Sequence, residues 1–263
     1  MIGLLALAAL AGSGAPAESA TYRVGAVLGS ADRVLTTEST IAVERVRGRR
    51  WTFAITRSSA SVEGRENWMF DSAQPRPTDP WPVTQMATIG RVSAEILLDK
   101  AGRPVGLADV AGWEDRSRAA LADLKLPGEA DTGGAALLDA DGLLEAYQRD
   151  FPGRPPKGSW TRIETVLDVP AQRIEDCAQE EAGDRITWRC EGTLTGTATV
   201  DGGTTTIEDG KTSTILVFDD VGLLSAESRW DATIRTVQGA EERARPVVGR
   251  RLLVREPADA ADI

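Results

Sequence analysis

The residues that could perform chemistry in this sequence are few. Histidine is absent from all 263 residues, so neither a Ser-His-Asp or Cys-His nucleophile system nor an imidazole zinc site can be built. Paired acids remain at Glu175-Asp176, Glu180-Glu181 and Asp219-Asp220. A retaining glycosidase needs two carboxyl groups roughly 5 Å apart in a cleft, whereas these acids belong to expected hairpin tips, where side chains are solvated. We therefore predict a protein that is not an enzyme, with no catalytic residues.

Two short motifs resemble ligand-binding loops and fail on spacing. Asp139-Ala140-Asp141-Gly142 resembles a calcium loop, but with Gly142 at position 6 the end ligands would be Leu137 and Gln148. Gly210-Lys211-Thr212 resembles the end of a phosphate-binding loop, but Thr205 stands where that motif needs glycine. The first is better explained as a helix cap, by Asp139 or Asp141, and the second as a hairpin turn. We predict no metal and no cofactor.

The two cysteines are predicted to form a disulfide. Cys177 and Cys190 lie symmetrically about Gly183-Asp184, a turn-forming pair. Directly opposed residues of an antiparallel hairpin have Cβ atoms roughly 4.5–5.5 Å apart, close enough for modest adjustment to bridge them. Two buried free thiols are the alternative. The chain contains no C-x-x-C sequence, which argues against redox catalysis.

The N-terminal residues have the pattern of an export signal. An apolar run over 2–11 is followed by Ala15-Pro16-Ala17 before Glu18, which predicts a signal peptide over 1–17 and a mature protein that starts near Glu18. The run is too short for a transmembrane helix, and Ser13 stands where a lipoprotein needs cysteine. The usual basic region is missing, which leaves the true start of translation open. The alternative interpretation of residues 1–17 is a fraying apolar N-terminal strand. If the segment is an export signal, the protein is periplasmic or secreted, soluble after signal removal, and in a compartment where its disulfide persists.

Apolar and polar residues alternate along most of the chain, which predicts strands with one buried face. Examples are the faces of 51–55, 92–98, 186–194 and 224–234, separated by turn signals at 201–203, 209–210 and 219–222. Helical spacing predicts two short helices, at 113–124 and 136–151. The fold class expected is mainly β (α+β). It is a long antiparallel curved sheet, an open half-barrel or a sandwich, with two short helices in the middle.

Five segments are expected along the chain. A weak repeat relates Ile96–Gly102 to Ile215–Gly222, so the sheet is either two related β-modules or a single sheet whose hairpins look alike. The segments are a signal peptide over 1–17, a β-rich N-terminal module over 18–125, a helical connector over 126–158, a β-meander over 159–256 and a disordered tail over 257–263.

A proline-rich and tryptophan-rich loop over 64–90 interrupts the first module. Its aromatic residues and methionine are the candidate ligand or lid contacts: Trp68, Met69, Phe70 and Trp81. The prolines keep this stretch out of a central strand. Large apolar side chains favour burial, so these residues either plug the core or form a lid over a groove.

A short segment carries a family resemblance. Pro152, Pro155, Gly158 and Trp160 form a P-x-x-P-x-x-G-x-W pattern that opens an expected strand, and an Asp-x-x-Gly hairpin follows. In this the C-terminal part resembles secreted β-rich bacterial families of unknown function, from which no activity can be carried over. The long strands, two helices and signal peptide also resemble, more distantly, the half-barrel lipoprotein carriers of the bacterial envelope.

These observations together predict a binding protein. The formal charge of −10 argues against nucleic acid and anionic membrane surfaces as partners. An exported curved sheet needs something to cover its apolar face, which predicts a non-enzymatic envelope protein that binds an apolar or lipid-like ligand. The alternative is a structural or protein-interaction module without a ligand groove, whose partner is an envelope protein. The oligomeric state stays open.

Overall fold

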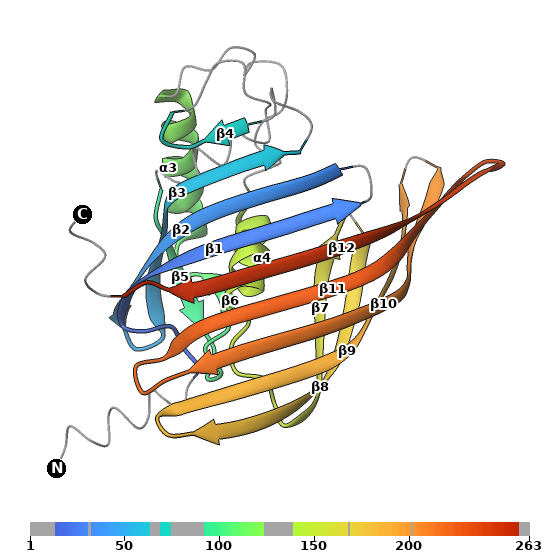
Figure 1. Cartoon of the computed structure of the whole chain (residues 1–263). Coiled ribbons are helices and arrows are strands. Elements are labelled where there is room, and N and C mark those ends of the chain that lie inside the picture. The colour runs from blue at the N-terminus through green and yellow to red at the C-terminus, as the bar shows by residue number, and fades with distance from the viewer. Residues whose placement is uncertain are drawn as a thin grey trace.

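The computed structural model describes residues 14–30, 33–63, 69–74, 92–123, 139–167, 169–200 and 202–257. Within these residues the chain forms one open antiparallel sheet of 12 strands and two helices (Figure 1). The strands are β1 Ser19–Ser30, β2 Arg33–Arg47, β3 Arg50–Val62, β4 Met69–Asp71, β5 Ala94–Leu98, β6 Pro104–Leu107, β7 Gly158–Val166, β8 Val169–Ala182, β9 Arg185–Val200, β10 Gly203–Phe218, β11 Leu223–Gln238 and β12 Glu241–Arg255.

The two halves of the sequence meet in the middle of this sheet. The strand order is β6-β5-β3-β2-β1-β12-β11-β10-β9-β8-β7, with β4 beside β3. The first strand pairs with the last, from Tyr22 opposite Arg255 to Ser30 opposite Val247. The predicted long curved antiparallel sheet is confirmed, and it is one continuous sheet.

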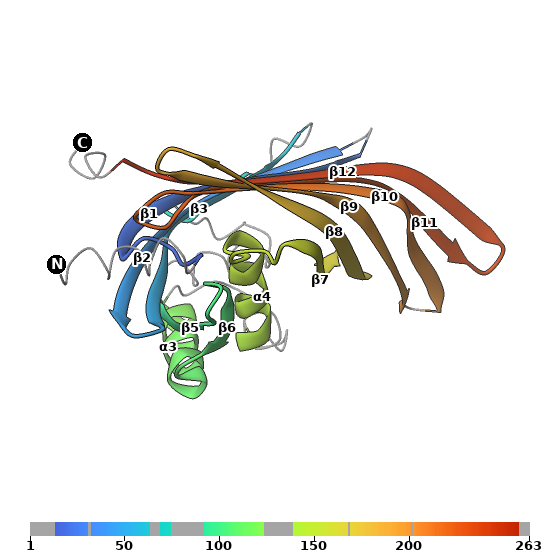
Figure 2. The same ribbon diagram turned by 90° about the horizontal axis from the view of Figure 1, so that it is seen from below.

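The sheet is strongly curved and both helices lie on its concave side (Figure 2). They are α3, Val110–Asp123, and α4, Ala140–Asp150. The second lies within the predicted stretch 136–151, whereas the first begins before the predicted stretch 113–124. Asp139 caps α4, and its side chain accepts a hydrogen bond from the Gly142 backbone amide. The calcium-like sequence is therefore a helix start, as expected.

Most predicted turns are found, and one is wrong. Gly183 and Gly202 have positive φ in tight hairpins. Between β10 and β11, the Asp219 carboxylate accepts hydrogen bonds from the backbone amides of Val221 and Gly222. Asp209-Gly210, predicted as a hairpin, is instead a bulge inside β10, where pairing to both neighbouring strands shifts register. A tight turn and a bulge use the same left-handed backbone conformation, and Asp209 has φ of 51°. Local sequence therefore does not distinguish a hairpin turn from a bulge at this position.

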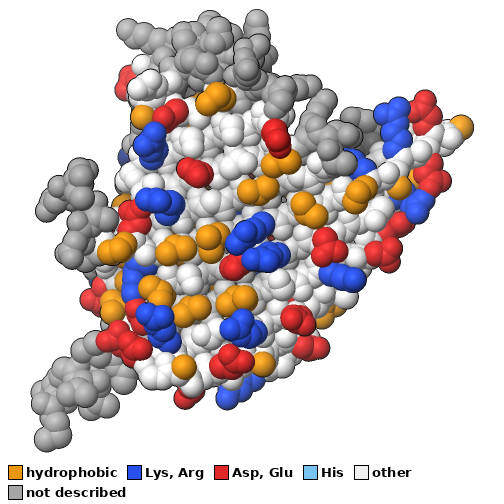
Figure 3. Space-filling view, viewed as in Figure 1, with side chains coloured by type: hydrophobic (Ala, Val, Ile, Leu, Met, Phe, Trp, Pro, Cys, Tyr) orange, Lys and Arg blue, Asp and Glu red, His pale blue; other side chains and the backbone are white. Residues whose placement is uncertain are grey.

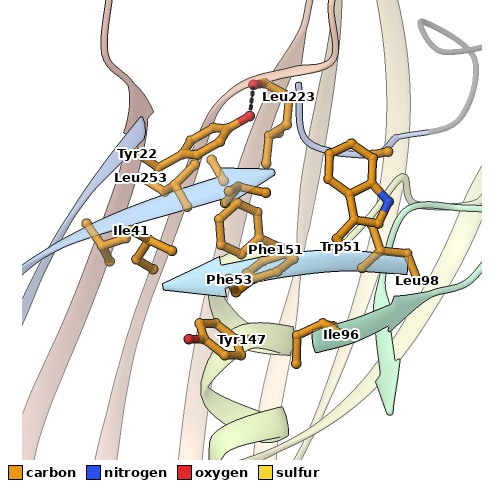
Figure 4. Close-up of a cluster of buried hydrophobic side chains, with 14 of the residues drawn as sticks. Tyr22, Ile41, Trp51, Phe53, Ile96, Leu98, Tyr147, Phe151, Leu223 and Leu253 are labelled. Atoms are coloured by element: carbon orange, nitrogen blue, oxygen red, sulfur yellow. Dashed lines mark hydrogen bonds between the residues drawn. The ribbon is translucent and has the colours of Figure 1, made fainter. Parts of the chain in front are cut away.

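The larger hydrophobic core lies between the concave face and α4. Phe53 on β3 contacts Tyr147 of α4 and Phe151 just after it, with ring centroids 4.9 Å and 5.0 Å apart. Phe151 also meets the edge of Tyr22 on β1 (Figure 4). These rings lie in one cluster with the Cys177–Cys190 pair. Edge-to-face aromatic packing therefore fixes α4 against the sheet.

A second, smaller cluster lies at the other end of the concave face. It contains Val169, Leu194, Ile207, Ile234 and other strand residues, and no residue of either helix. The sheet curls inward at this end (Figure 2), next to the β10 bulge. Bulges increase local twist and bend. Here the curl of the sheet closes the core, whereas at the first cluster a helix does so.

The residues before the first strand also pack into the fold. Residues 14–17 are buried, the Ala15 carbonyl accepts the Leu223 amide, and the Ala17 amide donates to the Tyr22 hydroxyl. That hydroxyl in turn donates to the Leu223 carbonyl, as drawn in Figure 4. The end of the proposed signal peptide over 1–17 therefore coincides with residues that make defined contacts, while 1–13 lie outside the described residues.

Candidate functional site

A cavity of about 490 Å³ lies between α4 and the concave face of the sheet. Its volume is in the range of small-molecule sites, roughly 300–1,000 Å³. Two contacts hold α4 over it: Gln148 donates to the Pro104 carbonyl on β6, and Glu145 accepts the Thr165 amide on β7. Since β6 and β7 are the two ends of the strand order, this helix connects both edges of the sheet across the hollow.

One wall of the cavity is apolar. It is formed by side chains from α4 and from the concave faces of β1, β2 and β3, namely Val24, Ala26, Ile41, Ile55, Leu143, Ala146 and Tyr147. Further apolar groups lie towards the curled end, namely Leu28, Leu35, Val166, Leu167 and Trp230. Gly249 of β12 faces Trp230 so closely that an added Cβ would lie 2.3 Å from the indole Nε1. The shape of this part therefore depends on a glycine.

The other wall is charged and belongs to β7, β8, β11 and β12. Arg173 is buried, and its guanidinium donates to Glu164 at 2.7 Å, to Glu175 at 3.5 Å and to the Ser228 hydroxyl at 2.7 Å. Glu175 is fully buried and also accepts from Arg162 at 2.7 Å. We call Arg162, Glu164, Arg173 and Glu175 the belt. Its members lie on the concave face between the two hydrophobic clusters.

Two polar groups reinforce the belt and one ring packs on it. The Thr214 hydroxyl on β10 donates to Glu175 at 2.8 Å, and Arg162 stacks over the Trp160 ring at 4.0 Å. The Nε of Arg162 is buried without a hydrogen-bond partner. Burial and the neighbouring Arg173 charge lower the pKa of Arg162, and Glu175 opposes that shift. The belt is therefore a buried cluster in a low-dielectric environment, in which each charged side chain is stabilised by the opposite charges beside it.

A second group of charges lies where α4 ends. Arg251 on β12 forms a close ion pair with the buried Asp150. Arg149 also lines the cavity, and no ion pair joins it to any of the described residues. Although its side chain reaches solvent, burial within the surrounding protein and the Arg251 charge lower the pKa of Arg149. The cavity thus has an apolar side and a cationic side, which suits an amphipathic ligand.

The convex face carries a different kind of hollow. It measures about 670 Å³ and is lined only by strand residues, many of them charged, such as Lys211, Arg229, Asp231 and Arg250. Figure 3 shows this face, where basic, acidic and apolar side chains are mixed over the sheet. No residue of α3 or α4 lines it, so it lacks the enclosure found on the concave side.

The structure describes two of the four candidate ligand or lid residues, Met69 and Phe70, and places both away from the cavity-lining residues. Trp68 and Trp81 lie outside the described residues. Met69 is 58% exposed and Phe70 is buried, both on β4 at the sheet edge, and neither is among the cavity-lining residues. Cys177 and Cys190 are directly opposite each other and form the predicted disulfide. A lid role for the four loop residues stays a prediction.

Sequence reasoning missed the belt and treated Glu175 as a solvated tip acid, which is wrong. Glu175 lies in the middle of β8, well before the turn, and is fully buried. A usable signal was present, because period two puts Arg173 and Glu175 on the same face as Cys177, which was predicted to pair with Cys190 on a buried strand face. Likewise Arg162 shares a face with Trp160, and Arg251 shares one with Leu253.

Two searches of the described part of the chain give negative findings. None of its helices is long and apolar enough to cross a membrane. Within the same residues, no three or more Cys, Asp or Glu side chains are grouped so as to hold a metal ion.

No protein-family model and no curated protein matches this chain. Among solved structures it is similar to lipovitellin, from a study of its lipid–protein interactions, at 12% identity over 91% of this chain, with a TM-score of 0.46. That match covers 25% of lipovitellin, so the chain spans about a quarter of its length. It is also similar to a LolA superfamily protein from Nitrosomonas europaea, at 10% identity over 97% of this chain and 94% of that one, with a TM-score of 0.18.

Proposed function

We propose that this protein is a non-enzymatic carrier or binding protein that takes an apolar, lipid-like molecule into the cavity between α4 and the concave face of the sheet. The observation that carries the proposal is the apolar wall of that cavity, to which Val24, Ile41 and Tyr147 contribute. Burying a methylene group there contributes about 0.8 kcal/mol. A chain of several methylenes would therefore bind with useful affinity.

The alternative is a structural or interaction module of the envelope that has no ligand groove. That alternative expects the helices to cover the concave face completely. A hollow of about 490 Å³ beneath α4 favours the binding function instead. The Cys177–Cys190 disulfide supports a site of action outside the cytoplasm, because disulfides persist in oxidising compartments.

A cavity-filling variant tests the proposal with a neutral apolar probe, N-phenyl-1-naphthylamine. Ala26 of β1 lines the cavity, so Ala26→Trp should fill it and weaken probe binding by about tenfold or more, a loss of about 1.4 kcal/mol. Ala42 of the neighbouring β2 lies between the buried Ile41 and Val43 and faces the convex side. Ala42→Trp should leave probe affinity unchanged.

The measurement is a fluorescence titration of the folded full-length chain, with circular dichroism of each variant to confirm the fold. If wild-type protein fails to bind the probe, or if both tryptophan variants bind as wild type does, the proposed site is wrong. Native mass spectrometry of protein purified from its own host gives a second readout. A co-purified apolar molecule that is absent from Ala26→Trp would identify the ligand class.

A further inference from the structure

The cavity is cationic in a protein that is acidic overall. The whole chain carries a formal charge of −10. The cavity is nevertheless lined by five arginines, Arg149, Arg162, Arg173, Arg250 and Arg251, and by three carboxylates, Asp139, Asp150 and Glu164. A local excess of positive charge inside a hollow focuses attraction on an anion. The negative charge of the whole chain argues against anionic surfaces as partners, but the charge inside the cavity has the opposite sign.

Most of these charges are already engaged. Asp139 caps α4, and Arg250 contacts Glu227 at 3.1 Å. Asp150 pairs with Arg251. In the belt, Glu164 pairs with Arg173, and Glu175 pairs with both Arg162 and Arg173. Among the described residues this leaves Arg149 as the lining arginine without an ion pair.

The surroundings of Arg149 favour an incoming anion. Burial and the Arg251 charge lower the pKa of Arg149, and the carboxylates of Asp150, Glu145 and Glu164 oppose that shift without forming an ion pair with it. A partly desolvated cation without an ion pair gains more from a new counter-ion than one in open water. The position is also suitable, because Arg149 is three residues after Ala146, which lines the apolar wall from the same helix. Residues at that spacing are neighbours on one helix face.

We propose that the ligand is a single-chain anionic amphiphile whose carboxylate or phosphate headgroup pairs with Arg149 while its alkyl chain lies along the apolar wall. The inference rests on the proposed function and adds the headgroup to it. Arg251 is already paired with Asp150, so Arg149 carries the recognition of the headgroup. The belt stays intact in this arrangement and forms the polar limit of the cavity.

The test compares three probes of equal chain length, dodecanoate, dodecan-1-ol and dodecyltrimethylammonium, by calorimetric titration below their aggregation thresholds. Wild-type protein should bind dodecanoate about tenfold or more tightly than dodecan-1-ol, because charge-assisted hydrogen bonds are the strong ones. The cationic probe should bind most weakly. Arg149→Gln should abolish the preference for dodecanoate and leave the affinity for dodecan-1-ol unchanged. Arg149→Lys should restore part of it.

The matched control is Arg118→Gln on α3, which removes the same charge from an exposed position. It should bind all three probes as wild type does. Acetate and inorganic phosphate test whether the anion alone is recognised, and neither should bind at the concentrations used. If dodecan-1-ol binds but the preference for dodecanoate is missing, or survives Arg149→Gln, the headgroup inference is wrong while the proposed function stands. If none of the three probes binds, the proposed function itself fails.

Discussion

The two walls of the cavity are buried to the same degree but built from opposite chemistry. On one wall, Ile41 and Tyr147 are almost fully buried among apolar side chains and aromatic rings. On the other, Arg173 and Glu175 are just as fully buried on the same face of the same sheet. Strand alternation decides which side chains point inward, and it treats both walls alike.

The difference shows which wall the fold itself requires. Apolar burial on the first wall stabilises the protein directly, through area removed from water and through packing. Buried ion pairs carry a desolvation cost that their attraction often fails to repay, so a sheet can be as stable with apolar residues in those places. We therefore expect the stability of the fold to depend more on the aromatic cluster than on the presence of ion pairs in the belt.

The largest expected effect comes from the aromatic cluster that packs against the apolar wall. Phe53→Ala removes a fully buried ring that contacts both Tyr147 and Phe151, and core truncations of this kind cost about 3–5 kcal/mol. Urea unfolding followed by circular dichroism measures the free energy of unfolding. Phe53→Leu retains most of the side chain and should lose clearly less. A loss below about 1 kcal/mol for Phe53→Ala would show that this cluster does not hold α4 in place.

The belt should respond to disruption in a different way. Glu175→Gln leaves Arg162 and Arg173 without their shared carboxylate and should lower the free energy of unfolding by about 3 kcal/mol, since unpaired buried charge is costly. The matched control is Glu180→Gln on the same strand. Glu180 pairs with Arg189 in the open, where ion pairs contribute roughly 0–1 kcal/mol.

A double replacement separates burial from charge. Arg162→Met with Glu175→Leu removes one buried pair and leaves Arg173 bound to Glu164 at 2.7 Å. The double variant should be more stable than Glu175→Gln alone, because no arginine is left without a carboxylate. If it were less stable, the belt would be a requirement of the fold, and the contrast between the two walls would fail.

The sequence predicted the framework well because that framework depends on local rules. Alternation located the long strands, and counting outward from Gly183-Asp184 paired Cys177 with Cys190 as the structure does. Asp139 was one of the two expected caps of α4. The Asp209-Gly210 error has a physical reason, since a bulge and a hairpin share the same backbone conformation and differ only in whether the strand continues.

The site depended on contacts that local rules do not reach. Arg162, Arg173 and Thr214 come from β7, β8 and β10, and only the register of the assembled sheet brings them onto Glu175. Alternation alone indicates that Glu175 faces inward with Cys177, but not that two arginines meet it there. The position of α4 over the hollow likewise depends on Gln148 and Glu145 reaching opposite edges of the sheet.

The smallest expected effect concerns an ion pair outside both walls, between Asp219 in the β10–β11 turn and Arg255 near the end of β12. Burial alone would raise the pKa of Asp219. Hydrogen bonds and charge from Arg255, together with the amides of Val221 and Gly222, outweigh it and lower the pKa below the usual 3.8. A carboxyl group with a depressed pKa in the folded state contributes stability above its unfolded pKa of about 3.9 and loses that contribution as pH falls through the folded value.

Wild-type protein should therefore lose part of its stability between about pH 4 and the lower folded pKa of Asp219, and Asp219→Asn should lose less over that interval. At pH 7 the variant should be less stable by about 1.5 kcal/mol, the lower end of the range for a hydrogen bond to a charged group. Thermal melts across the acid range measure both quantities. Asp184→Asn, in the exposed β8–β9 turn, serves as the control and should follow wild type. If Asp219→Asn also followed wild type at every pH, this pair would behave like an exposed ion pair, and coupling of charge to stability would be confined to the belt.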